Sequence, residues 1–264
     1  LRTQRDIDAG VLICQGREDM GALLVYDSPT PHESPAAYER LKQLWGDSWQ
    51  DCLSHCIAAI VNECPSEKNY LTIIGSSESG KSRKAESIMQ LISGSAVFVS
   101  PTKMEGHWPT VLSTRCATID NLDYNSLKPD DLNILAALAT TERVTVPARY
   151  TPSGLTKEGG YPIITSINSQ VLDHYIALKS RSVTINQQYD EKARELALDM
   201  KAIVSDAKPH IWFLVERFLE SRSEIPNQPG DLRIRGFARA RYFVAKVIEG
   251  LTDADSETVC RSYK

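Results

Sequence analysis

The stretch Tyr70-Leu-Thr-Ile-Ile-Gly75-Ser-Ser-Glu-Ser-Gly80-Lys81-Ser82 decides the fold of this 264-residue chain. Its apolar beginning predicts a buried strand, and the residues that follow match the pattern G-x-x-x-x-G-K-S. Glycines in such a loop let the backbone curl around a polyphosphate, so that main-chain N–H groups converge on the anion. The loop also precedes a helix predicted over residues 82–91, and strand, loop and helix together indicate a nucleotide site.

The polar residues of this loop have distinct expected roles. Lys81 supplies a positive charge, Ser82 is placed to ligate Mg²⁺, and the helix directs its positive end at the phosphates. The expected cofactors are therefore ATP and Mg²⁺. The residues expected to contact the nucleotide are Gly75, Ser76, Ser77, Glu78, Ser79, Gly80, Lys81, Ser82 and Arg83.

Composition limits the class of protein. The net charge of −4 argues against a uniformly basic surface, so any contact with nucleic acid must come from a local basic element or from repetition around an oligomer. The sequence contains neither an apolar stretch of the roughly 20 residues that a membrane span requires nor a start typical of a signal peptide, which predicts a cytoplasmic protein. Because the chain begins without Met, we expect it to be a piece of a longer polypeptide.

The six cysteines lack the regular spacing of a secreted disulfide framework, which predicts reduced thiols. Cys52, His55 and Cys56, with Cys64, could be read as a zinc site. However, apolar residues recur at helical spacing over residues 36–64, and no paired C-x-x-C motif is present. Buried positions on a helix therefore explain these cysteines better.

After Gly94 the chain alternates β-rich runs with polar or helical stretches, the pattern of an α/β fold with a parallel sheet covered by helices. We expect a helix over residues 130–139 and four further strands, over residues 96–100, 116–120, 162–168 and 182–185. In such sheets ligands bind at the carboxyl ends of the strands, so the polar residues that end each run are candidates for function.

Two of these runs end in residues with suitable chemistry. Asp120 follows the run Ala-Thr-Ile119, as a Walker B aspartate does on its way to the Mg²⁺ ion. Many ATPases have Glu next, to polarise the attacking water, whereas this chain has Asn121; Asp123 or another residue takes that task, or hydrolysis is slow. Asn168 could position a water against the γ-phosphate through its amide. Either residue can instead be an ordinary turn residue at the end of a strand.

Two basic segments lie between and after these strands. Residues 143–160 predict an inserted hairpin or long loop that carries Arg143, Arg149 and Lys157, which could contact a phosphate backbone or keep the loop solvated. Arg181, just before the last strand, is a candidate arginine finger contributed to an adjacent subunit. The alternative is a commonplace surface arginine.

The flanks are helical. Residues 1–69 are expected to form an accessory or oligomerisation segment, with a β-like start at residues 21–26, and residues 70–188 the ATPase core. Residues 189–264 are expected to form a helical lid, with helices over residues 190–205, 209–222 and 237–250. Arg233 and Arg235 precede the last helix and could reach the nucleotide, although such residues are usually solvated.

Taken in order, GSSESGKS, ATIDN, the insertion with ARYT, PIITSIN and LKSRSVTI resemble the AAA+ core of superfamily-3 helicases and of phage and poxvirus-type primase-helicases. The resemblance covers residues 70–187. It implies a three-layer P-loop NTPase fold with a five-stranded parallel sheet. It also implies a ring, usually a hexamer, with ATP between subunits and single-stranded DNA in the pore, where Lys157 would grip the strand.

The leading hypothesis is therefore a DNA-stimulated ATPase, the motor of a replicative helicase from a phage or mobile element. An ATP-dependent switch or assembly protein that remodels a partner is the alternative, which Asn121 and the net acidity favour. A small-molecule kinase would leave the insertion and Arg181 without a purpose.

Overall fold

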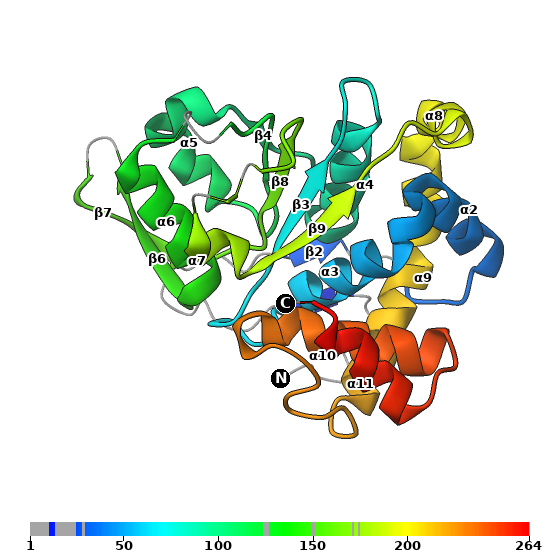
Figure 1. Cartoon of the computed structure of the whole chain (residues 1–264). Helices are drawn as coiled ribbons and strands as arrows, with labels where there is room; N and C mark the ends of the chain where they lie inside the picture. Colours follow the sequence, from blue (N-terminus) through cyan, green and yellow to red (C-terminus); the bar gives the residue numbers. More distant parts are fainter. Residues whose placement is uncertain are drawn as a thin grey trace.

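The structure is a computed structural model, which describes residues 11–13, 25–27, 30–123, 127–148, 151–170, 172–173 and 175–263. A five-stranded sheet lies at its centre, every strand pairing in it is parallel, and helices cover both of its sides (Figure 1). The expected α/β fold is confirmed. The strands of this sheet are β3 (Tyr70–Ile74), β4 (Phe98–Val99), β5 (Thr118–Ile119), β8 (Ile163–Ser166) and β9 (Ser182–Asn186).

The strand order in the sheet is β4-β5-β8-β3-β9. From β3 the chain crosses to the far edge at β4, returns through β5 and β8 to the side of β3, and adds β9 beyond it. Parallel neighbours need crossover connections, and the helices in them are α4 (Lys81–Ser93), α5 (Met104–Val111), α6 (Pro129–Thr140) and α7 (Ile176–Lys179). As a result, the carboxyl ends of β5, β8 and β3 lie side by side.

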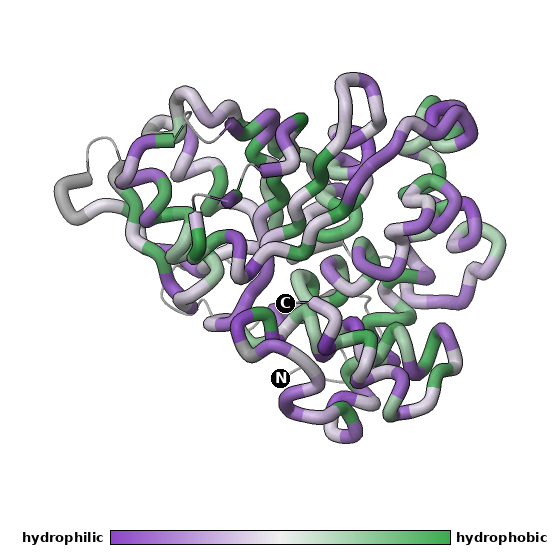
Figure 2. The backbone as a smooth tube through the Cα atoms, viewed as in Figure 1, coloured by the Kyte–Doolittle hydropathy of each residue, from purple (hydrophilic) through white to green (hydrophobic). Residues whose placement is uncertain are grey.

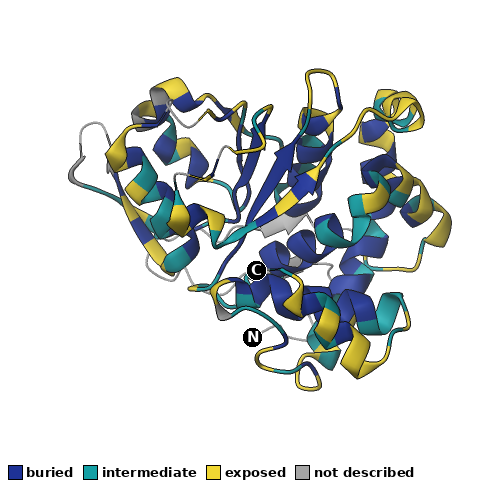
Figure 3. Ribbon diagram, viewed as in Figure 1, coloured by how far each residue is buried: buried dark blue, intermediate teal, exposed yellow. Residues whose placement is uncertain are grey.

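The sheet is buried on both faces, as expected for parallel strands between helices. Leu71 and Ile73 face one hydrophobic core, which α4 helps to form, and Tyr70 faces the other, which contains residues of α5 and α6. Figure 3 shows β3 in the dark blue of buried residues, and Figure 2 shows much of the same strand in the green of hydrophobic residues. Strand β9 forms an edge, where buried Val183 and Ile185 alternate with more exposed positions.

The expected insertion is a β-hairpin. Strands β6 (Arg143–Ala148) and β7 (Thr151–Glu158) pair antiparallel, and the hairpin lies between α6 and β8 in the chain. Strand β6 packs against α5 and α6, so the hairpin extends the layer on that face of the sheet (Figure 1). The hairpin is thus a fixed part of the domain along much of its length.

The N-terminal part differs from the expectation of one continuous helix over residues 36–64, which is wrong. Helices α2 (Pro35–Trp45) and α3 (Trp49–Val61) are separated by the short turn η2 (Gly46–Ser48). Gly46 has a φ of +59°, a left-handed conformation that glycine adopts without steric cost, and it ends α2. The buried helix positions predicted for Cys52 and Cys56 are confirmed on α3.

Part of the β-like segment at residues 21–26 falls on β2 (Val25–Asp27), which pairs antiparallel with β1 (Val11–Ile13). The remainder of that segment lies outside the described residues.

The C-terminal helices are α8 (Glu191–Leu198), α9 (Met200–Ser221), α10 (Arg235–Phe243) and α11 (Asp253–Arg261). The expected interruption near residue 205 is wrong, because the chain breaks at Asp199 and α9 continues through Pro209. A proline inside a helix removes one backbone hydrogen bond. The buried apolar face of α9, which includes Ile211 and Val215, offsets that loss.

The first and last parts of the chain share one core. Helix α2 packs against α9 and α3 packs against α10, so residues from both ends of the sequence cover the same face of the sheet. Helix α8 lies at the edge of this core, where Leu196 and Ala197 pack against it, and it also contacts α2. The boundaries at residues 69 and 188 remain predictions.

Candidate nucleotide-binding site

The candidate phosphate loop connects β3 to α4. At its start, a Cβ on Gly75 would lie 2.3 Å from the carbonyl oxygen of Gln187 and 2.6 Å from Oγ of Ser79, so only glycine fits there. Further along, Glu78 and Gly80 have φ values of +64° and +92°. Left-handed backbone costs a residue with a side chain roughly 1–2 kcal/mol, and such conformations cluster at functional sites.

The loop ends at the N-terminus of α4, which begins at Lys81, one residue before the predicted start. The first N–H groups of a helix have no partner within the helix, and its dipole favours negative charge there. Oγ of Ser79 is buried and finds no hydrogen-bond partner among the described residues. A phosphate oxygen could satisfy such an atom, so the loop fits the polyphosphate of a nucleotide.

Lys81 is folded onto the loop. Its Nζ donates to the carbonyl oxygens of Gly75 at 2.8 Å and of Ser76 at 2.6 Å. Burial lowers the pKa of Lys81, while the negative charge of Asp120 acts in the opposite direction. The ammonium group is therefore held where the loop and the end of β5 meet.

Thr165 on β8 organises the end of β5. Its Oγ1 donates to Oδ1 of Asp120 at 2.6 Å and accepts the N–H of Asn121 at 2.9 Å. Asn121 has a φ of +53°, which asparagine tolerates better than most residues, and its side chain is exposed. Thr165 thus orients the aspartate and the turn that follows it.

The oxygens of Ser82 and Asp120 are of the type that Mg²⁺ prefers. Among the described residues, no group of three or more His, Cys, Asp or Glu side chains could hold a metal ion. Mg²⁺ is commonly bound through one or two protein oxygens together with substrate phosphates and water. Binding of Mg²⁺ by Ser82 and Asp120 remains a prediction.

Asn168 follows β8 by two residues, since the strand ends at Ser166 rather than at residue 168. Its N–H donates to Oγ of Ser166 at 3.0 Å, and its side-chain Oδ1 accepts the N–H of Gln170 at 2.9 Å. The amide oxygen is therefore engaged in a local turn, and a role for Asn168 at the γ-phosphate remains a prediction.

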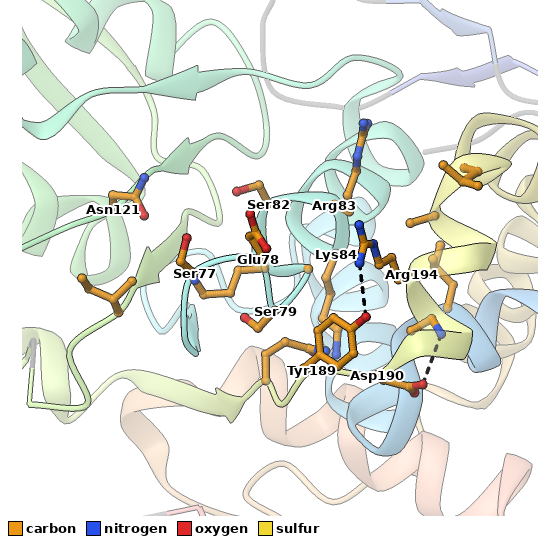
Figure 4. A pocket seen from close by; sticks show the side chains of 18 residues that line it. Ser77, Glu78, Ser79, Ser82, Arg83, Lys84, Asn121, Tyr189, Asp190 and Arg194 are labelled. Atoms are coloured by element: carbon orange, nitrogen blue, oxygen red, sulfur yellow. Dashed lines mark hydrogen bonds between the residues drawn. The ribbon is translucent and has the colours of Figure 1, made fainter.

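A cavity of about 450 Å³ opens beside the phosphate loop. One wall comes from the loop and the start of α4, and the other comes from α8 and the segment before it (Figure 4). Asn121 and Ile167 also line it, which places the ends of β5 and β8 at its rim. Its size lies in the usual range of pockets for small molecules.

Arg181 lies at the opposite end of the sheet. It precedes β9, and a five-residue strand spans about 16 Å, so in this structure Arg181 does not reach the phosphate loop of its own chain. Its Nη1 donates to the carbonyl oxygen of Arg233 at 2.5 Å. Arg233 also pairs with Asp231, and Arg235 pairs with Glu67 at 2.5 Å. These contacts hold Arg233 beside Arg181, and contact of Arg233 or Arg235 with a nucleotide remains a prediction.

The hairpin cations are placed unequally. Arg143 begins β6 and is exposed, and Arg149 lies outside the described residues. Lys157 is paired with Val144, which is buried, so both side chains are on the inward face near the base of the hairpin rather than at its tip. Contact of these residues with DNA remains a prediction.

Sequence reasoning missed two parts of the site. Thr165 is a polar residue within the otherwise apolar strand β8, which pairs with the strand that carries Asp120. A polar residue in such a run was the sequence signal that could have indicated its role. Tyr189 and Arg194 line the cavity, but they come from a segment that reads as an ordinary start of a helix. Only the packing of α8 beside the loop reveals them.

Strand order, loop geometry and the placement of Asp120 together specify the fold. It is a P-loop NTPase fold. No protein-family model and no curated protein matches the chain.

Several solved structures resemble this fold. The SCCmec type IV Cch active helicase aligns with a TM-score of 0.55 and 16% identity, over 87% of this chain and 50% of that one. The apo A form of the NrS-1 C-terminal region aligns with a TM-score of 0.50 and 12% identity, over 71% and 46%. The JCV helicase aligns with a TM-score of 0.42 and 12% identity, over 86% and 73%.

This chain therefore spans about half the length of the Cch and NrS-1 chains. At these identities the likeness concerns the fold. The likeness to helicases that the order of motifs indicated thus extends to the fold. No helix in the described part of the chain is both long enough and apolar enough to cross a membrane.

Proposed function

We propose that this chain is the NTP-hydrolysing motor core of a DNA helicase from a phage or other mobile element, and that it works as an oligomeric ring with ATP and Mg²⁺. The observation that carries the proposal is that the phosphate loop after β3 and Asp120 after β5 lie at the same, carboxyl edge of the sheet, with only β8 between their strands. The likeness in fold to the SCCmec type IV Cch active helicase supports it.

The residues divide the task as follows. The N–H groups at the start of α4 and the ammonium of Lys81 hold the phosphates, which requires Lys81 to exchange its carbonyl contacts for phosphate oxygens. Ser82 and Asp120 would hold Mg²⁺, and the bound ion neutralises charge on the β- and γ-phosphate oxygens. Thr165 keeps the carboxylate of Asp120 directed at that position.

Assembly into a ring is supported by Arg181. Because this residue lies far from the phosphate loop of its own chain, it can act as an arginine finger only on a neighbouring copy. The β6–β7 hairpin connects the segments that carry Asp120 and Asn168, so contact with DNA at the hairpin would be coupled to events at the nucleotide.

An ATP-dependent switch without unwinding activity is the second candidate. Asn121 favours it, because an amide at the position after the aspartate is a weaker base than a glutamate, and slow hydrolysis suits a switch.

Steady-state ATP hydrolysis by the purified chain, with and without single-stranded DNA, tests the proposal. The Lys81→Ala variant serves as the blank. We expect DNA to stimulate turnover; hydrolysis that is indifferent to DNA would favour the switch, and failure to bind ATP would contradict both candidates.

A further inference from the structure

The wall of the cavity opposite the phosphate loop belongs to one continuous segment that follows β9. Gln187, Tyr189 and Asp190 precede α8, and the helix then adds Ala193, Arg194, Ala197 and Leu198. Figure 4 shows Tyr189 and Arg194 on this wall, with Ser77, Glu78 and Ser79 of the loop nearby. A triphosphate on the loop would therefore place the rest of the nucleotide next to this wall.

That wall carries exposed apolar side chains. Among the described residues the exposed large hydrophobic side chains are Phe98, Ile167, Ile176, Tyr189 and Leu198; Tyr189 and Leu198 lie on this wall, and Ile167 lines the cavity from the end of β8. Tyr189 is 54% exposed and Leu198 is 87% exposed. Exposed apolar side chains that gather at one cavity mark a binding site for an apolar or aromatic group.

Several polar groups of the same wall make hydrogen bonds within the segment. Arg194 Nη1 donates to Tyr189 Oη at 3.2 Å, and Asp190 Oδ1 accepts the N–H groups of Lys192 and Ala193, which caps α8. Gln187 Nε2 donates to the carbonyl oxygen of Gln188 at 3.0 Å. These bonds hold the side chains in place without involving the phosphate loop.

We propose that residues 187–198 bind the base of the nucleoside triphosphate, that the ring of Tyr189 stacks on it, and that adenine and guanine are accepted alike. This inference rests on the proposed function, because it takes the phosphate loop to hold the triphosphate. Stacking on an aromatic side chain tolerates any base, since every base has a π-face. The link between Arg194 and Tyr189 holds the ring in place for that contact.

Calorimetric binding of ATP, GTP and inorganic tripolyphosphate to the full chain tests the inference. Tyr189→Ala is expected to weaken the binding of ATP and of GTP by the same factor, about tenfold or more, and to leave the affinity for tripolyphosphate unchanged. Tyr189→Phe keeps the ring and is expected to bind both nucleotides nearly as well as the unaltered chain. Because Tyr189 is exposed, neither substitution removes a core residue.

Ile176→Ala is the matched control, since Ile176 is 79% exposed and lies outside the cavity. It should change none of the three affinities. Unaltered ATP binding by Tyr189→Ala, or a loss confined to one base, would overturn the inference while tripolyphosphate binding upheld the phosphate site. If the unaltered chain bound neither nucleotide nor tripolyphosphate, the proposed function would fail, and the inference with it.

Discussion

The two ends of the central sheet use charged residues in opposite ways. At the carboxyl end, Lys81 lines an open cavity, the charge of Asp120 acts to raise the pKa of Lys81, and Asp120 accepts a hydrogen bond from the neutral hydroxyl of Thr165. At the amino end, the carboxylate of Glu63 is 2% exposed and pairs with Arg239 at 2.7 Å and with Arg222 at 3.0 Å. One end keeps its charges within reach of a ligand, and the other uses them to connect elements of the fold.

The amino end connects parts that are distant in sequence. Glu63 follows α3, Arg239 lies on α10, and Tyr161, which precedes β8, donates its hydroxyl to the carbonyl oxygen of Glu63 at 2.7 Å. Lys68 adds bonds to the carbonyl oxygens of Leu138 and Thr141. We therefore expect substitutions at the amino end to lower the stability of the fold and substitutions at the carboxyl end to lower activity.

The largest effect is expected for Glu63→Ala. Removing this carboxylate leaves Arg239 buried without its counter-charge, which should lower the free energy of unfolding by about 3–5 kcal/mol, measured by urea denaturation. The control is Glu257→Ala, which breaks an exposed pair with Arg261 and should cost less than about 1 kcal/mol. Equal losses of unfolding free energy in the two variants would show that the buried pair at the amino end contributes no more to stability than an exposed pair.

At the carboxyl end, Lys81→Ala should lower turnover while it leaves stability nearly unchanged. Without the ammonium group, charge that develops on the phosphates is not neutralised, and turnover should fall roughly hundred- to thousandfold. The free energy of unfolding should change by no more than about 1 kcal/mol, because the charge is itself penalised by burial. Lys201→Ala, an exposed lysine on α9, is the control for both measurements. A variant that retained full turnover would show that this end is not the active one.

A pH titration sharpens the contrast further. Burial lowers the pKa of His55 to about 4, and its Nδ1 lies 3.0 Å from Nδ2 of Asn69. The unfolded chain takes up a proton near pH 6.5 that the folded chain refuses, so the free energy of unfolding should fall by roughly 3 kcal/mol between pH 6.5 and pH 4. In His55→Gln this part of the pH dependence should vanish; if the two curves stay parallel, His55 is not its source.

The smallest effect is expected for Thr165→Val. The substitution keeps the shape of the side chain but removes the bonds to Asp120 and to the N–H of Asn121. Turnover should fall about tenfold, in line with the loss of a hydrogen bond to a charged group, while ATP binding persists. Thr184→Val on the exposed face of β9 should leave turnover unchanged. Unaltered turnover in Thr165→Val would mean that Asp120 needs no support from β8.

Local patterns predicted the elements of the sheet but not their order in it. Tyr70–Ile74 is a strand as its apolar run indicated, and the helix after the loop begins within one residue of its expected start. The position of β8 between β5 and β3 depends on which faces pack against helices, and no run of residues encodes that locally. The passage of α9 through Pro209 has the same origin, because packing of the helix outweighs one missing hydrogen bond.

At the site, the sequence predicted those residues that belong to a recognisable motif. Lys81 and Asp120 have such motifs, and the structure places them near one another. Tyr189 has none, since its role depends on the approach of α8 to the loop. Lys157 illustrates the converse, because a charge count marked it while the strand register places it on the inward face of the hairpin.

Gly75 has a consequence for how such motifs are interpreted. The atoms that exclude a side chain there belong to Gln187 and Ser79 of the same chain, so this glycine is required before any nucleotide arrives. The N–H of Gln187 also donates to the carbonyl oxygen of Ile74, which ties the end of β3 to the segment that leads into α8. The first glycine of the motif thus reflects how two strands are joined, and a protein with this fold would need it even if it no longer bound a nucleotide.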